Sequence, residues 1–233
     1  VDLAAAKEMG VAVSNASGYS NDSVAELTLC MALSLLRNLP QVDAHCREGK
    51  TKDGLVGREL RGKTVGLVGT GAIGARVAEL FAAFGCRVLA ANDHSRKPST
   101  ALITYLPLAE LLPQVDILSL HCPLNEGTRG LIGAQALSRI KRGAILINAA
   151  RGPVVDTAAL AEALHSGQLG GAGIDVFETE PPLPTDHPLL HTPNTIVTPH
   201  VAFATKESME KRADIVFRSL QLWLQGEQIN KVL

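Results

Sequence analysis

Three side chains that could carry acid–base chemistry, Arg151, Glu180 and His200, each come soon after a short apolar segment that reads as a strand. Because the carboxyl ends of parallel strands meet at one edge of a sheet, we expect these side chains to lie close together. A guanidinium can hold a planar carboxylate by two parallel hydrogen bonds, and an imidazole can move a proton near neutral pH. The combination suits a small keto acid as ligand. Taken singly, a strand-end arginine is more often a surface ion-pair residue and a lone histidine is more often structural.

A glycine-rich segment indicates a second ligand. Residues 65–74 read VGLVGTGAIG, in which Gly69, Gly71 and Gly74 follow the spacing G-x-G-x-x-G. The first glycine allows a tight turn, the second lets the backbone approach a pyrophosphate, and the third lets the next helix pack closely. Apolar residues at helical spacing follow, so the glycines stand between a strand and a helix N-terminus. This context predicts a dinucleotide site rather than a plain glycine-rich turn.

The choice between two dinucleotides depends on the polar residues after the next predicted strand. Asp93 could accept hydrogen bonds from both ribose hydroxyls, as NAD requires. Asn92, together with Arg96 and Lys97, could instead hold the 2′-phosphate of NADP. We expect NAD, and NADP is the alternative.

The elements that must position these residues alternate between strand and helix. We predict strands at residues 64–68, 87–91, 116–121, 144–148, 173–177 and 195–198, and a short strand at 11–14. Helices are predicted near residues 2–9, 20–39, 72–84, 107–112, 133–140, 157–166 and 203–225, with Asn21 or Ser23 capping the second and Asp156 capping the sixth. Short apolar strands joined by helices predict an α/β fold with a doubly wound parallel sheet of the Rossmann type.

Composition excludes several classes of protein. The 233 residues carry a net charge of −1 and contain no basic block, so we expect no nucleic-acid partner. Apolar runs stay below the roughly 18 residues that span a membrane, so no membrane association is expected. The four cysteines, Cys30, Cys46, Cys86 and Cys122, form no C-x-x-C pair. We interpret them as buried free thiols in a reducing cytoplasm, with no metal site.

The remaining histidines carry less information. His121 ends a predicted strand, and both a contact with a cofactor and a structural role stay open for it. No motif surrounds the others, which we assign to solvent or to structural hydrogen bonds: His45, His94, His165, His187 and His191.

Five ordered motifs, GTGAIG, HCPLNEGTRGLI, INAARGPVVDTAAL, GAGIDVFETEPP and TPHVA, together resemble the D-isomer-specific 2-hydroxyacid dehydrogenase family over the whole chain. The resemblance implies that Arg151, Glu180 and His200 form the catalytic site. It also implies contacts with the cofactor from the glycine loop, from Arg151 and His200 themselves, and from Ala72, Ile73, Cys122, Pro123, Thr128, Ala149, Ala150 and Asp175. Asn92 departs from the family pattern, because many members have the ribose-binding aspartate there.

The family's activity implies hydride transfer between a nicotinamide cofactor and a small D-2-hydroxy acid or 2-oxo acid. Arg151 would orient the substrate carboxylate, His200 would move the proton, and Glu180 would stabilise the protonated imidazole. Two alternatives stay open: a nucleotide-sensing interaction protein resembling the corepressors related to this family, and an inactive cofactor-binding remnant.

The resemblance further implies a two-part organisation. Residues 1–17 would be a remnant of a flavodoxin-like substrate domain whose N-terminal half is absent from this sequence. Residues 18–199 would form the dinucleotide-binding domain, and residues 200–233 would return to the substrate domain through a helix. The apolar helix within residues 20–39, together with the pairing of relatives through their cofactor domains, predicts a homodimer.

Overall fold

The computed structural model describes residues 1–91 and 97–233. Asn92, Asp93 and Arg96 lie outside the described residues, so the contacts expected of them with a ribose or a 2′-phosphate stay predictions. His94 also lies outside these ranges.

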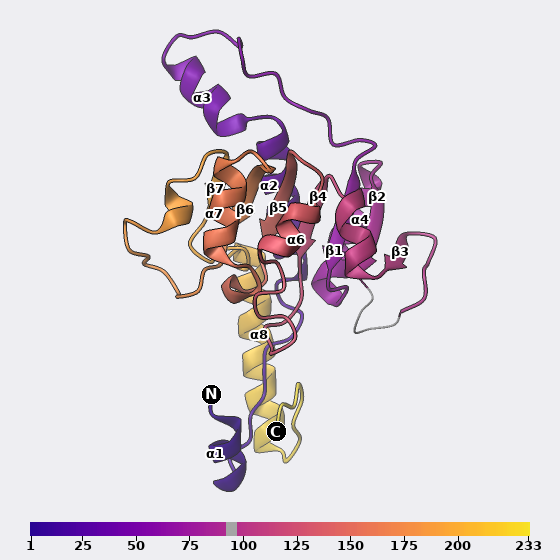
Figure 1. The fold of residues 1–233 in the computed structure, drawn as a ribbon. Helices are drawn as coiled ribbons and strands as arrows, with labels where there is room; N and C mark the ends of the chain where they lie inside the picture. Colours follow the sequence, from indigo (N-terminus) through magenta and orange to yellow (C-terminus); the bar gives the residue numbers. More distant parts are fainter. Residues whose placement is uncertain (92–96) are drawn as a thin grey trace.

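A parallel sheet forms the centre of the molecule (Figure 1). In the described ranges it has seven strands in the order β3-β2-β1-β4-β5-β6-β7, and every neighbouring pair is parallel. The strands are β1 (Thr64–Val68), β2 (Arg87–Ala91), β3 (Ile103–Leu106), β4 (Ile117–Leu120), β5 (Ala144–Asn148), β6 (Leu169–Ile174) and β7 (Thr195–Val197). The order reverses between β1 and β4, which is the point where such sheets bind ligands.

Helices cover both faces of this sheet. The helices of the described ranges are α1 (Leu3–Glu8), α2 (Asn21–Leu36), α3 (Leu39–Arg47), α4 (Ala72–Ala83), α5 (Leu108–Leu111), α6 (Ala134–Arg139), α7 (Thr157–His165) and α8 (Lys206–Leu224), with short 3₁₀ turns η1 (Leu112–Gln114), η2 (Gly152–Val154) and η3 (Pro188–Leu190). Of these, α2, α4, α5, α6 and α7 pack on the sheet. Asp156 caps α7 as predicted, because its carboxylate accepts a hydrogen bond from the backbone N–H of Ala159. The doubly wound α/β fold is confirmed.

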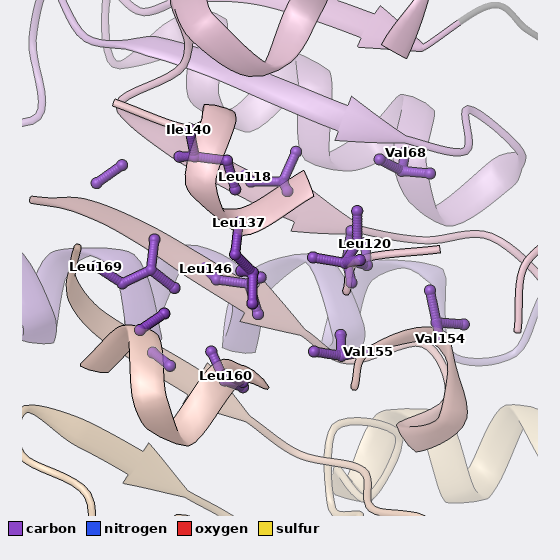
Figure 2. Packing of buried hydrophobic residues seen from close by; sticks show 14 of the residues in the cluster. Val68, Leu118, Leu120, Leu137, Ile140, Leu146, Val154, Val155, Leu160 and Leu169 are labelled. Atoms are coloured by element: carbon purple, nitrogen blue, oxygen red, sulfur yellow. The ribbon is translucent and has the colours of Figure 1, made fainter. Parts of the chain in front are cut away.

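Two apolar clusters bury the two faces. One lies between the sheet and α2 with α4, and it includes Met31 and Phe81. The other lies between the sheet and α5, α6 and α7. In Figure 2, Leu118 and Leu146 from the strands meet Leu137 from α6. All residues of β4 and β5 are buried, as expected for central parallel strands covered on both faces.

Several predicted elements are wrong in detail. The strand β3 was not predicted, and it is a short edge strand in which only Ile103 is buried. The strand β6 begins at Leu169 rather than at residue 173, because its LGGAGI sequence has little side-chain signal. Its glycines are needed for packing: a Cβ on Gly171 would lie 2.8 Å from the carbonyl of Asn194, and one on Gly173 would lie 2.9 Å from the sulfur of Met31.

The N-terminal predictions also need correction. Residues 11–14 form no strand in the structure; Ser14 makes only an isolated antiparallel bridge with Lys231. The second helix ends at Leu36, and Pro40 lies in the first turn of a separate helix, α3, where its missing N–H is tolerated. The N-cap of α2 is Ser20 rather than Asn21 or Ser23, and the Ser23 hydroxyl donates to the Ser20 carbonyl at 3.1 Å.

The four cysteines are free, but the expected burial is wrong for Cys30 and Cys46, which are exposed. Cys86 is half-buried and Cys122 is buried. The helix α3, which carries Cys46, has no buried residue and lies away from the sheet (Figure 1). No helix in residues 1–91 and 97–233 is long and apolar enough to cross a membrane.

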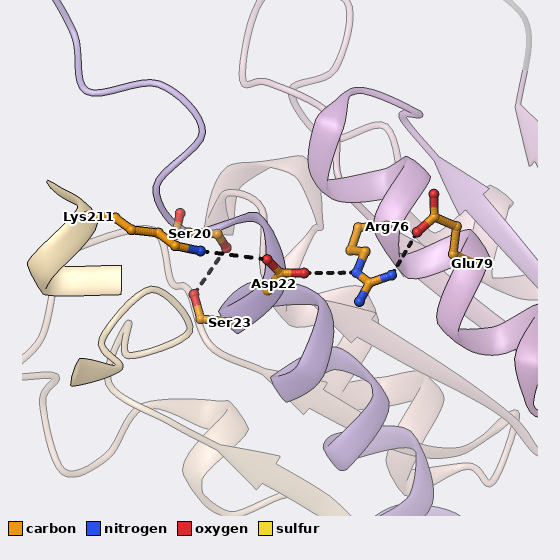
Figure 3. Close-up of polar contacts among 6 residues, drawn as sticks. All are labelled: Ser20, Asp22, Ser23, Arg76, Glu79 and Lys211. Atoms are coloured by element: carbon orange, nitrogen blue, oxygen red, sulfur yellow. Dashed lines mark hydrogen bonds and ion pairs between the residues drawn. The ribbon is translucent and has the colours of Figure 1, made fainter. Parts of the chain in front are cut away.

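The long helix α8 extends away from the sheet, and α1 and both chain ends lie near its far end (Figure 1). Its first turns are held against the body by polar contacts (Figure 3). Lys211 lies 3.9 Å from Asp22, whose carboxylate also accepts a 2.8 Å hydrogen bond from Arg76 of α4. The buried hydroxyls of Ser208 and Ser23 are hydrogen-bonded at 3.0 Å. We call α1, the segment 9–17, α8 and the residues after it the limb.

Candidate active site

The sheet brings the predicted catalytic residues to one edge. Arg151 follows β5, Glu180 follows β6 and His200 follows β7, and these three strands are neighbours. The Nδ1 atom of His200 lies 2.7 Å from Oε2 of Glu180. The His200 side chain is 28% exposed and that of Glu180 is 74% exposed. Because Nδ1 faces the carboxylate, Nε2 is the ring nitrogen that can meet a substrate.

A buried carboxylate shapes the turn that carries His200. Asp175 is fully buried, and its carboxylate accepts hydrogen bonds from the Thr198 hydroxyl at 2.5 Å and from the backbone N–H groups of Val201 and Ala202 at 2.9 Å. The His200 N–H donates to the Asp175 carbonyl at 2.8 Å. His200 itself has a φ of 57°, in the left-handed region that non-glycine residues rarely adopt. The turn is therefore wrapped around Asp175, and a contact of Asp175 with the cofactor stays a prediction.

The loop that carries Arg151 is held by two residues whose roles sequence reasoning missed. The buried Asn148 side chain donates to the Arg151 carbonyl at 3.0 Å and accepts from the Ala150 N–H at 3.1 Å. A Cβ on Gly152 would lie 1.9 Å from the Phe177 carbonyl oxygen, so the Arg151 loop packs backbone to backbone against the loop after β6. The sequence pattern that could have identified Asn148 and Gly152 is the N-x-x-R-G spacing within INAARGP.

Arg151 itself is exposed at this edge, and its Nη1 donates to the Ala150 carbonyl at 2.6 Å. Ala149 is half-buried and Ala150 is buried. The predicted contacts of these two alanines with a cofactor stay predictions.

The glycine loop has the geometry that a pyrophosphate requires. A Cβ on Gly69, whose φ is 97°, would lie 2.6 Å from the His121 carbonyl, and one on Gly74 would lie 2.1 Å from the Gly69 carbonyl. A Cβ on Gly71 would meet nothing within 4 Å, and Gly71 is exposed as the N-cap of α4. The first backbone N–H groups of α4, beginning at Ala72 and Ile73, are therefore open to an anion at the positive end of the helix.

The end of β4 lies beside the glycine loop. His121 Nε2 is 2.8 Å from the Ser119 hydroxyl, and burial lowers the pKa of His121 to about 4, so its ring is neutral at physiological pH. Burial raises the pKa of the Cys122 thiol, which stays protonated. Thr128 is buried, and its hydroxyl donates to the Pro123 carbonyl at 2.6 Å. Cys122, Pro123 and Thr128 thus form one ordered turn, and their predicted contacts with the cofactor are untested.

Lys97, which follows β2 in the sequence, contacts the glycine loop. Lys97 Nζ lies 2.7 Å from the Thr70 carbonyl and 3.2 Å from the Thr70 hydroxyl, which also accepts a hydrogen bond from Tyr105 at 3.0 Å. Of the four polar residues discussed for cofactor choice, Lys97 is the one that the structure describes.

Comparison with known proteins agrees with this geometry. Residues 29–202 match the family model described as D-isomer specific 2-hydroxyacid dehydrogenase, NAD binding domain. The chain belongs to this family. The D-isomer specific 2-hydroxyacid dehydrogenase fold and the dependence on a nicotinamide dinucleotide are thereby confirmed, and the chain is an oxidoreductase.

Individual relatives of this dehydrogenase cover nearly the whole chain. A glyoxylate reductase of Korarchaeum cryptofilum is 38% identical over 234 residues, which are 97% of this chain and 70% of the relative. A crystal structure of D-lactate dehydrogenase with NAD+ from Lactobacillus jensenii superimposes with a TM-score of 0.88 at 36% identity, over 100% of this chain and 74% of that one. An acyclic imino acid reductase in complex with NADPH and D-Arg gives a TM-score of 0.91 at 32% identity, over 100% and 74% of the two chains.

Proposed function

We propose that this dehydrogenase reduces a small 2-oxo acid to the D-2-hydroxy acid, and catalyses the reverse reaction, with His200 as the proton donor and acceptor. The observation that carries the proposal is the 2.7 Å contact between Glu180 and His200 beside the cofactor edge of the sheet. A carboxylate at Nδ1 stabilises the protonated ring and leaves Nε2 to face the substrate oxygen.

The substrate would be held by Arg151. Its guanidinium can take the carboxylate of a 2-oxo acid and place the neighbouring carbonyl oxygen toward the His200 ring. In reduction, Nε2 of His200 gives its proton to the oxygen of the forming alkoxide; in oxidation, the neutral ring removes that proton from the hydroxyl.

The residues present fit a nicotinamide dinucleotide. The open space at Gly71 and the free N–H groups at the start of α4 suit its pyrophosphate, whereas added side chains at Gly69 and Gly74 would collide with backbone. When bound, the nicotinamide ring supplies or accepts the hydride. We propose NAD as the preferred cofactor, as the sequence predicts from Asp93.

Steady-state kinetics of the full-length protein tests this function. We expect nicotinamide absorbance to change with glyoxylate, hydroxypyruvate or branched 2-oxo acids. His200→Ala should lower turnover roughly 100-fold or more and leave cofactor affinity nearly unchanged, because its proton acts in the chemical step. His191→Ala is the control, since the ring of this exposed histidine bonds only the Thr185 carbonyl among the contacts described for it. Normal turnover by His200→Ala would favour the nucleotide-sensing alternative.

We propose that the limb belongs to a substrate domain, in keeping with the expected division at residues 17 and 199. The support is the exposure of its apolar side chains: Phe217 is 66% exposed and Trp223 is 56% exposed. Hydrogen exchange should show the limb opening independently of the sheet. Uniform protection across both parts would contradict this division.

We also propose a homodimer that forms through α2 and α3. An apolar groove is lined by Leu29 and Leu33 of α2, Leu39 and Val42 of α3, and Val56 of the following loop. Val56 is 84% exposed, so a second copy would cover it. Sedimentation should find a dimer that Val56→Asp weakens and Met9→Asp, an exposed substitution on the limb, leaves intact. A monomer at micromolar concentration would contradict the dimer.

A further inference from the structure

A second carboxylate–imidazole pair lies in the same loop as Glu180. His187 Nε2 is 3.2 Å from Glu178 Oε2, and the His187 side chain is only 11% exposed. Its ring meets Phe177 edge-on, with 5.3 Å between ring centroids and an interplanar angle of 85°. The pair is therefore built into the packing of the loop after β6 rather than free in solvent.

The proton on His187 can be placed from its contacts. The backbone N–H of Leu189 donates to His187 Nδ1 at 3.3 Å. A ring nitrogen that accepts a hydrogen bond carries no proton, so the neutral ring has its proton on Nε2 and donates it to Glu178. Both nitrogens of the neutral ring therefore have hydrogen-bond partners.

Glu178 joins three segments of the chain. Besides His187, the Thr157 side chain at the start of α7 and the Glu178 backbone N–H act on this carboxylate and lower its pKa. Burial alone would raise the pKa of Glu178, but these hydrogen bonds outweigh it and hold the pKa below its usual value. The carboxylate is therefore ionised at neutral pH, when it acts as the acceptor that ties the segments together.

This junction lies next to both loops of the candidate site. Gly152, one residue after Arg151, already packs against the backbone of Phe177 and Glu178. Glu180 lies two residues after Glu178, and its side chain is 74% exposed. An exposed carboxylate is not held by its own packing, and pairing it with His200 costs conformational entropy unless the loop is already ordered.

We propose that Glu178 and His187 are positioning residues, which order the loop after β6 so that Glu180 meets His200. The inference rests on the proposed function. Neither side chain needs to touch the substrate: Glu178 anchors the loop to α7, and His187 closes it through the turn before η3. Around His200 the facing acidic groups are Glu180 at Nδ1 and the buried Asp175 beneath its backbone.

The pH dependence of 2-oxo-acid reduction in the full-length protein distinguishes positioning from general structural support. Glu180→Gln removes the charge that stabilises the protonated His200 ring, so the rate should fail at a lower pH. Glu178→Ala and His187→Ala should shift the profile in the same direction and lower kcat roughly threefold to tenfold, because a displaced Glu180 stabilises the ring less. KM for the cofactor should stay unchanged.

Two further variants make the test specific. Glu178→Gln keeps an oxygen that can accept from His187 and Thr157, so it should behave nearly like the wild type and rescue the loss seen with alanine. In the double variant Glu178→Ala/Glu180→Gln, the profile should match that of Glu180→Gln alone, because the positioning effect acts through Glu180.

The outcomes separate the two proposals. If Glu180→Gln shifts the profile and both Glu178→Ala and His187→Ala leave it unchanged, the positioning role is wrong and the proposed function stands. If the double variant shifts beyond Glu180→Gln, Glu178 acts by another route and the inference is also wrong. If His200→Ala and Glu180→Gln both turn over normally, the proposed function fails. Should Glu178→Ala not fold, as judged by circular dichroism and cofactor binding, the profile of His187→Ala carries the test, and Glu178→Gln stays the control that should match the wild type.

Discussion

The sheet and the limb use similar apolar residues in opposite ways. Every residue of β5 is buried, whereas Ser208 is the one buried residue of α8. Phe81 of α4 is fully buried, and Phe217 of α8 is 66% exposed. The comparison shows that helices of this chain bury both apolar faces of the sheet. Exposing the apolar side chains of the limb to water costs free energy, as expected for a surface that contacts another domain.

The largest expected effect is at the loop contact behind the site. Gly152→Ala would force a Cβ to within 1.9 Å of the Phe177 carbonyl oxygen, so the loops must separate. We expect a loss of more than about 4 kcal/mol of unfolding free energy, or no folded protein. Gly71→Ala is the matched control: its Cβ meets nothing, and poorer N-capping should cost at most about 1 kcal/mol. Urea denaturation compares the two, and equal losses would contradict the close packing.

Two phenylalanines compare the regions directly. Phe81→Ala should lower the unfolding free energy by about 3–5 kcal/mol, because a buried ring is lost from the core between the sheet, α2 and α4. Phe217→Ala should change it by less than about 0.5 kcal/mol in this 233-residue chain, since the ring is mostly exposed. Denaturant midpoints measure both. A large effect of Phe217→Ala would show that the limb is part of the same packed core.

The glycine loop separates stability from binding. Gly71→Val should weaken cofactor binding roughly 100-fold or more, about 2.7 kcal/mol, because the branched side chain occupies the space for the pyrophosphate. The sheet should stay folded, since that space is open in the structure. Ala83→Val, at the other end of α4, is the control. Fluorescence titration with NADH measures affinity, and normal binding by a folded Gly71→Val protein would contradict this site.

The smallest expected effect is at Asp116, which precedes β4 at the edge of the sheet opposite the candidate site. The Asp116 carboxylate accepts hydrogen bonds from the Thr64 N–H at 2.8 Å and from Lys141 at 3.0 Å. Burial would raise the pKa of Asp116, but these contacts outweigh it and lower that pKa. A depressed folded-state pKa means that the stabilisation is present above the unfolded value, about 4, and is lost as pH falls through the folded value.

Asp116→Asn should therefore cost about 1 kcal/mol at neutral pH, and the difference from wild type should shrink in acid. Denaturant midpoints across that pH range measure it. Asp43→Asn, in an exposed ion pair of α3, should have no measurable effect. A difference for Asp116→Asn that stays constant with pH would show that the ionised carboxylate is not the stabilising form.

Prediction of the strands from sequence succeeded where a run of apolar side chains marks a buried strand. The strands 64–68, 87–91 and 144–148 have the predicted bounds, because each is an apolar run between polar or glycine-rich turns. It failed where a buried strand is made of glycines, which pack through their backbone and have no side chain to mark the strand. The strand β6 contains glycines at positions 170, 171 and 173, which read as a turn in sequence and pack closely in three dimensions. The edge strand β3 has one buried residue and little pattern to detect.

The candidate site divides in the same way. The residue types and their order predicted that Arg151, Glu180 and His200 would follow neighbouring strands, and the structure pairs Glu180 with His200. Asn148 and Gly152 were not singled out, because one acts through its amide on a local loop and the other through the absence of a side chain. The catalytic and cofactor-binding roles stay predictions.

The sequence by itself determined the fold class and the family, since both depend on local patterns: apolar runs, glycine spacing and strand-end motifs. Only the tertiary structure decided what holds the site in place. Asp175 lies 25 positions before His200, and their contact forms because the turns after β6 and β7 meet. Glu178 lies nine positions before His187, and their contact forms because the loop between β6 and β7 folds back on itself. Such contacts join residues distant in sequence, and a hydrogen bond depends on distance and direction that no local spacing specifies.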